Sequence, residues 1–332
     1  MSAEVQPGTV YDTIIVGGGA AGLSAALYAG RYLMKTLVLE GTAPGGDTAV
    51  AWIVENYPGV PHVDGFELIR RMREQAAGFG ATFASEEAAG ASSEQHCFTV
   101  RTKGGTDYYS KTLILAHGEK HRHLGLPREG ELANGKGLSY CVTCDGPLYK
   151  GKIIAIVGGG DSSVKGAVLA ARYATHVYLI TMEHELHAEP VNLEEFKRLE
   201  NVTVLYDTVV TEFKGEPRLA GVKLSRSHEG TDELAVEGLF VEIGEVPSPE
   251  LARSLGVALD EHGLIEVDPM MKTSVDGVYA CGDTVNETGS FKQIVVGAAQ
   301  GALAATSAYR DLGMHGGNAC AIHARPAAHQ PA

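Results

Sequence analysis

Short apolar runs that lead into glycine-rich turns set the pattern of this chain. Residues 11–16 form the first run, and the stretch 20–33, rich in small residues, follows the glycines as a predicted helix. A second apolar run over 36–40 ends in an acid. Apolar runs of this length, bounded by turns, are typical of buried parallel strands. The order therefore predicts a strand, a helix and a second parallel strand.

The same succession returns in the middle of the chain. An apolar run over 152–157 leads into glycines, a helix is predicted to about Ala174, and residues 176–180 form the next apolar run. A unit that recurs in one chain indicates a repeated structural module. We therefore expect an α/β fold with two Rossmann-like nucleotide-binding domains of the three-layer ββα type.

The remaining pattern predicts further elements around these two modules. Asp64 is the expected N-cap of a helix over 64–80. The other expected elements are strands within 96–115, 202–213, 219–226 and 235–243, a linker over 245–249, and a helix over about 293–312. The segment 313–332, rich in His, Gly, Ala and Pro, is predicted to be a disordered tail.

Composition and charge narrow the class of protein. The chain has 332 residues and a formal net charge of −14, which argues against nucleic acid and against an anionic membrane surface as partners. No apolar run has membrane-spanning length, and residues 1–10 lack the pattern of a signal peptide. We expect a cytoplasmic protein, in which a close pair of cysteines is more often catalytic or metal-binding than structural.

The first glycine turn carries a dinucleotide-binding pattern. Gly17 permits the tight turn, Gly19 lets a pyrophosphate approach the backbone, and Gly22 lets the helix pack against the strand. The helix opens at Ala20 and Ala21, where free N–H groups face the pyrophosphate.

Glu40 completes this pattern at the end of the second strand. An acid in that position is placed to accept hydrogen bonds from the hydroxyls of an adenosine ribose.

Between the two modules lies a cysteine pair followed by an acid. Cys141 and Cys144 are separated by two residues, a spacing that can bring their Cα atoms to the distance that a disulfide needs. One thiolate can form a mixed disulfide that the other resolves, while Asp145 supplies a proton path. The alternatives are a buried pair and half a zinc site. Zinc needs four ligands; no second CxxC is present, although His121 and His123 lie upstream.

These residues together resemble the low-molecular-weight thioredoxin reductase family over about residues 10–312. The resemblance rests on both glycine turns, on residues 54–59, on residues 141–146, and on Gly282-Asp283 with Lys292-Gln293. It implies a homodimer and a discontinuous FAD-binding domain of residues 1–118 plus 250–332. A domain of residues 122–246 that carries the cysteine pair would be inserted into it and would rotate between two orientations.

The resemblance also assigns roles by position. Cys144 would lie against the flavin, Cys141 would attack the disulfide of a thioredoxin-like partner, and Asp145 would be the acid/base. Asp283 would bind near the ribityl chain and Gln293 near the isoalloxazine. The remaining FAD-binding candidates lie in matching stretches: Gly46, Asn56, His117, Gly118, Lys292 and Ile294.

The second glycine turn departs from the family where NADPH would bind. Members that use NADPH carry arginines just after the second strand of the inserted domain, whereas residues 181–187 hold no arginine and contain Glu183 and Glu185. A 2′-phosphate needs cationic partners, so NADPH is a poor expected donor and the chain reads as an atypical, NADPH-independent member. The candidate residues of this turn are Gly158, Gly160, Asp161, Ser162 and Ser163.

Three donors stay open. NADH could bind with Glu183 on its ribose, although this acid comes slightly later than Glu40 does. Ferredoxin could dock on the basic segment 117–123, or a second flavin could occupy the turn. His117 and Asp47 also stand where the family has Thr and Gln, which indicates an altered flavin environment.

The sequence thus predicts an FAD-dependent dithiol–disulfide oxidoreductase without a metal. Its partner would be thioredoxin or a similar protein. A flavin and disulfide redox sensor without rapid turnover is the alternative; a flavin oxidase would leave the cysteine pair without a role. Cys97 and Cys281, in apolar strand patterns, are expected to be buried and inert, and a second redox role for Cys320 is a further possibility.

Overall fold

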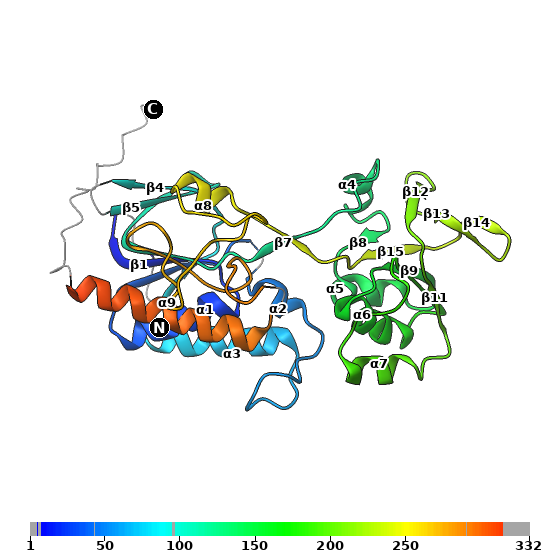
Figure 1. Ribbon diagram of the computed structural model, residues 1–332, viewed down its shortest axis with the longest axis horizontal. Helices are drawn as coiled ribbons and strands as arrows, with labels where there is room; N and C mark the ends of the chain where they lie inside the picture. Colours follow the sequence, from blue (N-terminus) through cyan, green and yellow to red (C-terminus); the bar gives the residue numbers. More distant parts are fainter. Residues whose placement is uncertain (1–4, 6–7, 43, 95–96, 290, 315–332) are drawn as a thin grey trace, which may run out of the picture. The chain divides into compact units, whose positions relative to one another are not determined.

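Two units make up the fold, and each contains a parallel sheet. The computed structural model describes residues 5, 8–42, 44–94, 97–289 and 291–314. Unit 1 comprises Met1–Glu119 and Pro247–Ala332, and unit 2 comprises Lys120–Val246 (Figure 1). Unit 2 is therefore a continuous insertion in the sequence of unit 1.

The sheet of unit 1 has strand order β3-β2-β1-β6-β5-β4, and β17 also pairs with β6. Its parallel strands are β1 (Val10–Val16), β2 (Thr36–Leu39), β3 (Thr82–Ala84), β6 (Asp107–Leu115) and β17 (Val278–Ala280). Strands β4 (Ala88–Glu94) and β5 (Cys97–Thr102) extend it by antiparallel pairing. Strand β1 lies between β2 and β6, so its carboxyl end, where the first glycine turn begins, is central.

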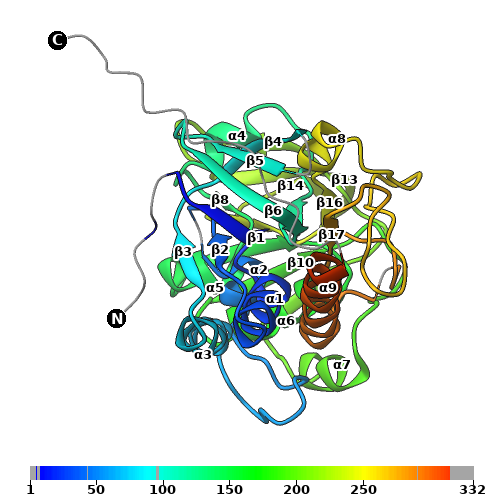
Figure 2. The ribbon, with the colours of Figure 1, turned by 90° about the vertical axis from the view of Figure 1, so that its left-hand side faces the viewer.

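Three helices pack together beneath this sheet, as Figure 2 shows: α1 (Ala20–Arg31), α3 (Gly65–Gly78) and α9 (Ile294–Met314). Small side chains let α1 and α9 approach closely, because a Cβ on Gly301 would lie 2.0 Å from the Ala21 carbonyl oxygen. Alanines of both helices fill the contact, among them Ala25 and Ala304. Two short helices complete the unit, α2 (Gly46–Val50) and α8 (Glu250–Ser254).

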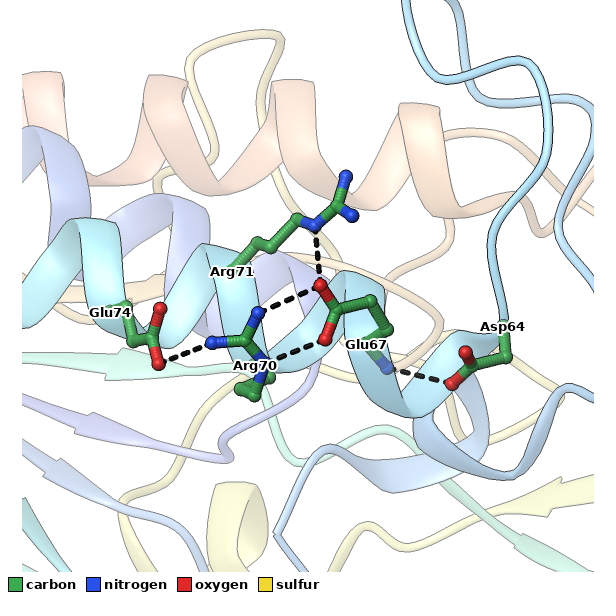
Figure 3. A network of polar contacts seen from close by, with 5 residues as sticks. All are labelled: Asp64, Glu67, Arg70, Arg71 and Glu74. Carbon is green, nitrogen blue, oxygen red and sulfur yellow. Dashed lines mark hydrogen bonds and ion pairs between the residues drawn. The ribbon is translucent and has the colours of Figure 1, made fainter.

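Helix α3 begins at a side-chain cap and carries a surface network of charges. The Asp64 carboxylate accepts a hydrogen bond from the Glu67 amide at 2.9 Å. Glu67 in turn accepts bonds from Arg70 and Arg71, and Arg70 also reaches Glu74 (Figure 3). The hydrogen bonds from the two arginines lower the pKa of Glu67 to about 2. Helix α3 packs against α1, which follows the first glycine turn, and its N-terminus is thus fixed by the Asp64 cap.

Unit 2 repeats the parallel arrangement, with strand order β11-β10-β9-β15-β8. The strands are β8 (Leu138–Ser139), β9 (Ile153–Val157), β10 (His176–Ile180), β11 (Val202–Leu205) and β15 (Gly238–Val241). A separate antiparallel sheet contains β12 (Val210–Lys214), β13 (Gly221–His228) and β14 (Thr231–Leu234). The helices are α4 (Glu129–Leu132), α5 (Val142–Asp145), the 3₁₀ turn η1 (Gly146–Tyr149), α6 (Asp161–Ala171) and α7 (Pro190–Phe196).

The chain passes between the two units through two strands that pair with each other. These are β7 (Glu119–His121) and β16 (Glu245–Pro247). The Arg122 amide continues the pairing with a hydrogen bond of 2.9 Å to the Gly244 carbonyl. The expected linker over 245–249 therefore begins as a strand.

The predicted α/β class with Rossmann-like modules is confirmed, and some element boundaries differ. The strands expected within 96–115 are confirmed as the antiparallel pair β5 and β6. Helix α9 extends to Met314, so Gly313 belongs to this helix and not to a tail; residues 315–332 lie outside the described part. Within the residues that the structure describes, no helix combines the length and apolar character needed to cross a bilayer.

Candidate functional site: two glycine turns and a disulfide

The first glycine turn is shaped by backbone contacts that leave no room for side chains. Gly17 has a φ of +117°, and a Cβ on it would lie 2.0 Å from the Ala116 carbonyl oxygen. A Cβ on Gly22 would lie 2.0 Å from the Gly17 carbonyl oxygen. Gly19 differs, because the nearest atom to its Cβ position, on Gly45, is 3.8 Å away. The turn therefore packs α1 tightly onto β1 and leaves open space above Gly19, as a pyrophosphate requires.

Helix α1 presents its N-terminus to this open space. It starts at Ala20 and Ala21, and no side chain caps it, since Gly19 is the N-cap. Unpartnered N–H groups of the first turn form an anion site. Gly46 lies close by, with its Cβ position 4.0 Å from the Gly19 Cα, and it opens helix α2 from a positive φ.

Glu40 lies at the predicted place and has a partner that the sequence did not indicate. Its carboxylate accepts two hydrogen bonds from Arg73 on α3, at 2.7 and 3.0 Å, and its side chain is 2% exposed. Hydrogen bonding to Glu40 raises the pKa of Arg73, although burial opposes this, and the guanidinium lies 4.2 Å from the Phe83 ring centroid. A carboxylate has about four acceptor positions, so Glu40 held in this way can still accept from a ribose.

Residues from distant parts of unit 1 meet at the other end of this cradle. The Asn56 side-chain amide donates to the Gln293 Oε1 at 2.9 Å, and Ile294 begins helix α9 directly afterwards. This bond joins the loop after α2 to the start of α9. The candidates Asn56, Gln293 and Ile294, found from separate motifs, thus lie together.

Charged groups gather around Asp283, just after strand β17. Burial raises the pKa of the Asp283 carboxyl; Lys292 opposes the shift, while Glu119 and Asp47 add to it. Lys292 forms an ion pair with Glu119, whose side chain is 5% exposed. Glu119 was not a sequence candidate, because it belongs to no motif and its position at the start of β7 shows only in the structure.

His117 contacts the chain that returns to unit 1. Its Nε2 lies 3.0 Å from the Ser248 carbonyl oxygen, to which it donates, and 3.3 Å from the Thr284 hydroxyl. Gly118 follows with a φ of +66°. The imidazole is therefore held between β6 and the segment after β16 by bonds within unit 1.

The cysteine pair of unit 2 forms a disulfide. Cys141 and Cys144 have Cα atoms 5.3 Å apart. Cys141 is the N-cap of the four-residue helix α5, and its Sγ accepts from the Cys144 amide at 3.0 Å. A sulfur that accepts an amide hydrogen bond at a helix start is stabilised as thiolate once the disulfide opens. The disulfide favours redox chemistry over zinc binding, for which both sulfurs would have to be free thiolates.

Asp145 is held beside the pair by a serine that the sequence did not single out. The Ser139 hydroxyl donates to the Asp145 Oδ2 at 2.7 Å and accepts from the Cys141 amide at 3.0 Å. The Asp145 amide also bonds to the Cys141 carbonyl at 3.2 Å. Ser139 thus joins the carboxylate to the backbone of Cys141.

A polar cluster lies just before the cysteines. The Tyr140 hydroxyl lies 2.6 Å from His123 Nδ1 and donates to Glu129 at 2.9 Å. Burial and the bond to Glu129 raise the pKa of Tyr140. The His121 ring stacks on Tyr140 with centroids 5.8 Å apart. Both histidines that kept the zinc hypothesis open therefore pack around this tyrosine.

The second glycine turn keeps the three leading glycines of the first and differs at the three residues that follow them. Gly158 has a φ of +146°, and a Cβ on it would lie 2.2 Å from the Glu242 carbonyl oxygen, much as Gly17 approaches Ala116. Ser163 stands where the first turn has Gly22, and its hydroxyl donates to the Gly160 carbonyl at 2.8 Å. Gly160 is the N-cap of α6 and has no side-chain cap bond. This turn can also receive a pyrophosphate.

The first two residues of α6 differ in their surroundings. Asp161 contacts Lys165 at 2.7 Å, the Asn192 amide at 2.7 Å and the Glu189 N–H at 2.9 Å. Burial alone would raise the pKa of Asp161, but these partners lower it. Ser162 is exposed.

One unit thus holds an open glycine turn, and the other holds a disulfide and a second glycine turn. The model of the pyridine nucleotide-disulphide oxidoreductases matches residues 11–301 of the chain. The chain belongs to this family.

Within this family, the chain is similar to thioredoxin reductases. It is 40% identical to the thioredoxin reductase of Mycolicibacterium smegmatis, over 92% of this chain and 97% of the relative. It is 38% identical to the thioredoxin reductase of Treponema pallidum, over 90% and 96%. The crystal structure of Lactococcus lactis thioredoxin reductase matches with a TM-score of 0.85 and 33% identity, over 92% and 99%. The predicted class, a thioredoxin reductase-like oxidoreductase, is confirmed.

The other cysteines of this family member differ from one another. Cys281 is a buried free thiol, and burial raises its pKa to about 12. Cys97 is equally buried but is disulfide-bonded, so the expectation of an inert thiol is wrong for it. Cys320 lies outside the described residues.

Proposed function

We propose that the protein is an FAD-dependent dithiol–disulfide oxidoreductase that reduces thioredoxin or a similar protein. The observation that carries the proposal is the Cys141–Cys144 disulfide with Asp145 fixed beside it. Residues 1–118 plus 250–332 would form the FAD-binding domain, and residues 122–246 the inserted domain that carries the disulfide. We also propose that the protein is a homodimer, as the family resemblance implies.

The residues of unit 1 fit a flavin dinucleotide. Gly17, Gly19 and Gly22 give the pyrophosphate its space, and Glu40 is fixed at the end of β2 for the ribose. Asp283 supplies a half-buried carboxyl beside the Lys292–Glu119 ion pair, and burial raises its pKa. Bound FAD would supply the electron pair that opens the Cys141–Cys144 disulfide.

The opened pair can then reduce a partner in two balanced steps. The Cys141 thiolate attacks one sulfur of the partner's disulfide, which forms a mixed disulfide and releases the other sulfur as a thiolate. The Cys144 thiolate attacks Cys141, which restores the Cys141–Cys144 disulfide and releases the partner's second sulfur. Two electrons pass to the partner, and Asp145 is placed to deliver protons to the departing thiolates.

For the electron donor we propose a species other than NADPH. Residues 181–187 hold two glutamates and no arginine, a poor site for a 2′-phosphate. NADH, ferredoxin and a second flavin are the candidates. The basic segment is a weaker ferredoxin site than its sequence indicated. His123 is bound to Tyr140 and lies 3.6 Å from the Glu129 carboxylate, and His121 lies 3.9 Å from Glu245.

The output reaction tests the proposal independently of the donor. Purified holoenzyme, photochemically reduced without excess reductant, is mixed with oxidised thioredoxin, and new thiols are counted. We expect one dithiol per reduced flavin, and no transfer by Cys144→Ser. Cys281→Ser is the matched control, since Cys281 is buried and has no role in the transfer. Protein without flavin, or transfer that survives Cys144→Ser, would overturn the proposal. Transfer on the scale of hours would favour the redox sensor.

A further inference from the structure

We propose that Glu183 recognises the adenosine ribose of NADH at the second glycine turn, which makes NADH the electron donor. The inference rests on the proposed function, because it identifies the source of the electrons that the disulfide passes on. It is carried by the geometric match between the two turns, by the course of residues 181–187, and by the charges around them.

The two turns match at the strand that follows each of them. The Gly17 amide donates to the Leu39 carbonyl at 2.9 Å, and the Gly158 amide donates to the Ile180 carbonyl at the same distance. Leu39 and Ile180 are therefore equivalent, and the residues after them are Glu40 and Thr181. The acid that contacts ribose in the first module has a threonine at its backbone equivalent in the second.

A turn after Thr181 brings a carboxylate back to the same place. Thr181 is 1% exposed, and its hydroxyl accepts a hydrogen bond from the Glu183 amide at 3.1 Å. A hydroxyl that bonds to the amide two residues on folds the chain into a tight turn. The Glu183 side chain consequently lies over the second turn even though it comes two positions later in the sequence.

The middle glycine of each turn gives a reference point for comparing the positions of Glu40 and Glu183. A Cβ on Gly18 would lie 3.1 Å from the Cγ of Glu40. A Cβ on Gly159 would lie 3.3 Å from the Cγ of Glu183. Both carboxylates thus start from the same place relative to their glycine turns. Glu183 was a weak candidate because it comes two positions after the sequence equivalent of Glu40. The turn at Thr181 compensates for these two residues.

The rest of the segment runs along the glycine turn. The His187 amide donates to the Gly159 carbonyl at 2.8 Å, and His187 forms a parallel bridge with Gly160. Residues 183–187 therefore border the nucleotide position, and their charges act directly on what binds there.

The charges at this border favour hydroxyls over a phosphate. Glu183 and Glu185 are both exposed and acidic. The nearby basic side chains His184 and Arg226 both contact Asp207, Arg226 at 3.2 Å. A ribose 2′-hydroxyl can donate to the Glu183 carboxylate, whereas a 2′-phosphate would meet a like charge. FAD shares this ribose, but a pyridine nucleotide is the ligand that the family's description pairs with a disulphide.

Binding to the holoenzyme tests the inference. NAD⁺ and NADP⁺ are titrated calorimetrically, and flavin bleaching by NADH and NADPH is followed anaerobically. We expect NAD⁺ to bind roughly tenfold or more tighter than NADP⁺, since the preference depends on a charge-assisted hydrogen bond. Glu183→Gln should lose most of this preference, and Glu183→Arg should reverse it. Glu185→Gln is the matched control, with an equal charge change two residues away, and should keep the preference.

Several results would overturn the inference. They are equal or tighter binding of NADP⁺, a preference that survives Glu183→Gln, no binding of either dinucleotide, and two flavins per chain. The output assay with photochemically reduced enzyme separates this failure from failure of the proposed function. The wild-type holoenzyme, once its flavin is photochemically reduced, should transfer electrons to thioredoxin whether or not it binds NAD⁺.

Discussion

At the scale of single residues, the hydrogen bonds around Asp145 show how the acid is positioned. Ser139 donates to the carboxylate and accepts from the Cys141 amide, and its own side chain is buried. The hydroxyl therefore joins the Asp145 carboxylate to the backbone of Cys141. We propose that Ser139 is a positioning residue that acts through the proposed acid/base Asp145.

Replacing this serine tests that role. Ser139→Ala should slow transfer to thioredoxin by roughly tenfold, because a charge-assisted hydrogen bond to the carboxylate is lost. Transfer rates of photochemically reduced holoenzyme at one pH measure the effect. Ser139→Thr keeps the hydroxyl and should restore the rate. An unchanged rate in Ser139→Ala would contradict the role, and an equal loss in Ser139→Thr would show a structural role alone.

The residues that the sequence could not supply share one property. Arg73, Ser139 and Glu119 belong to no spacing pattern, and each acts by contact with a motif residue. Arg73 comes from α3 and reaches Glu40 across thirty-three positions, a contact that only the packed fold creates. The cysteines, the turn glycines and Glu40 could be predicted because their chemistry depends on local spacing.

At the scale of elements, the two glycine turns are a natural comparison. Gly22 allows α1 to contact the Gly17 carbonyl, whereas Ser163 stands at the same position in α6. The first helix therefore packs more closely on its strand than the second needs to. A side chain should be tolerated in one turn and not in the other.

Matched substitutions test this difference. Gly22→Ala should weaken FAD binding about 10- to 100-fold, because its Cβ would lie 2.0 Å from a carbonyl oxygen and overpacking costs about 1–3 kcal/mol. Ser163→Gly removes a side chain and should leave flavin content unchanged. Flavin per chain after dialysis measures both. Equal flavin loss in the two variants would contradict the argument.

The sequence predicted elements well where apolar runs were continuous and poorly where pairing decides them. Strands β1 and β9 follow from apolar runs that end at glycines. Strands β7 and β16 are three residues each, and their pairing partner is more than a hundred residues away, so no local pattern marks them. The turn at Thr181 could not be predicted either, because a side-chain hydrogen bond forms it and no local sequence pattern marks it.

At the scale of the whole molecule, the insertion gives two compact units, for which we propose separate ligands. Each unit has its own buried core, with one cluster around β1 and β6 and another around β9 and β15. We expect each ligand to stabilise the unit that holds it. The repeated module could be predicted from the returning strand–glycine–helix pattern, whereas its insertion into the other unit followed only from the family resemblance.

Calorimetry of the whole chain tests this independence. FAD at about a hundredfold excess over its Kd should add about 2.7 kcal/mol to the stability of unit 1 and leave the transition of unit 2 in place. NAD⁺ should shift only the transition of unit 2. The apo-protein and holoprotein are scanned with and without NAD⁺. A single transition that both ligands move together would show that the units unfold as one.

The paired strands β7 and β16 have a consequence for how such enzymes diversify. The two ends of the inserted segment, residues 120–246, lie in strands β7 and β16, which are hydrogen-bonded to each other. An inserted segment whose two ends are adjacent can be replaced as a whole without a change in the fold of the host domain. If the inserted unit binds the electron donor, as we propose, the donor can change by replacement of this segment while the sheet of unit 1 is inherited intact.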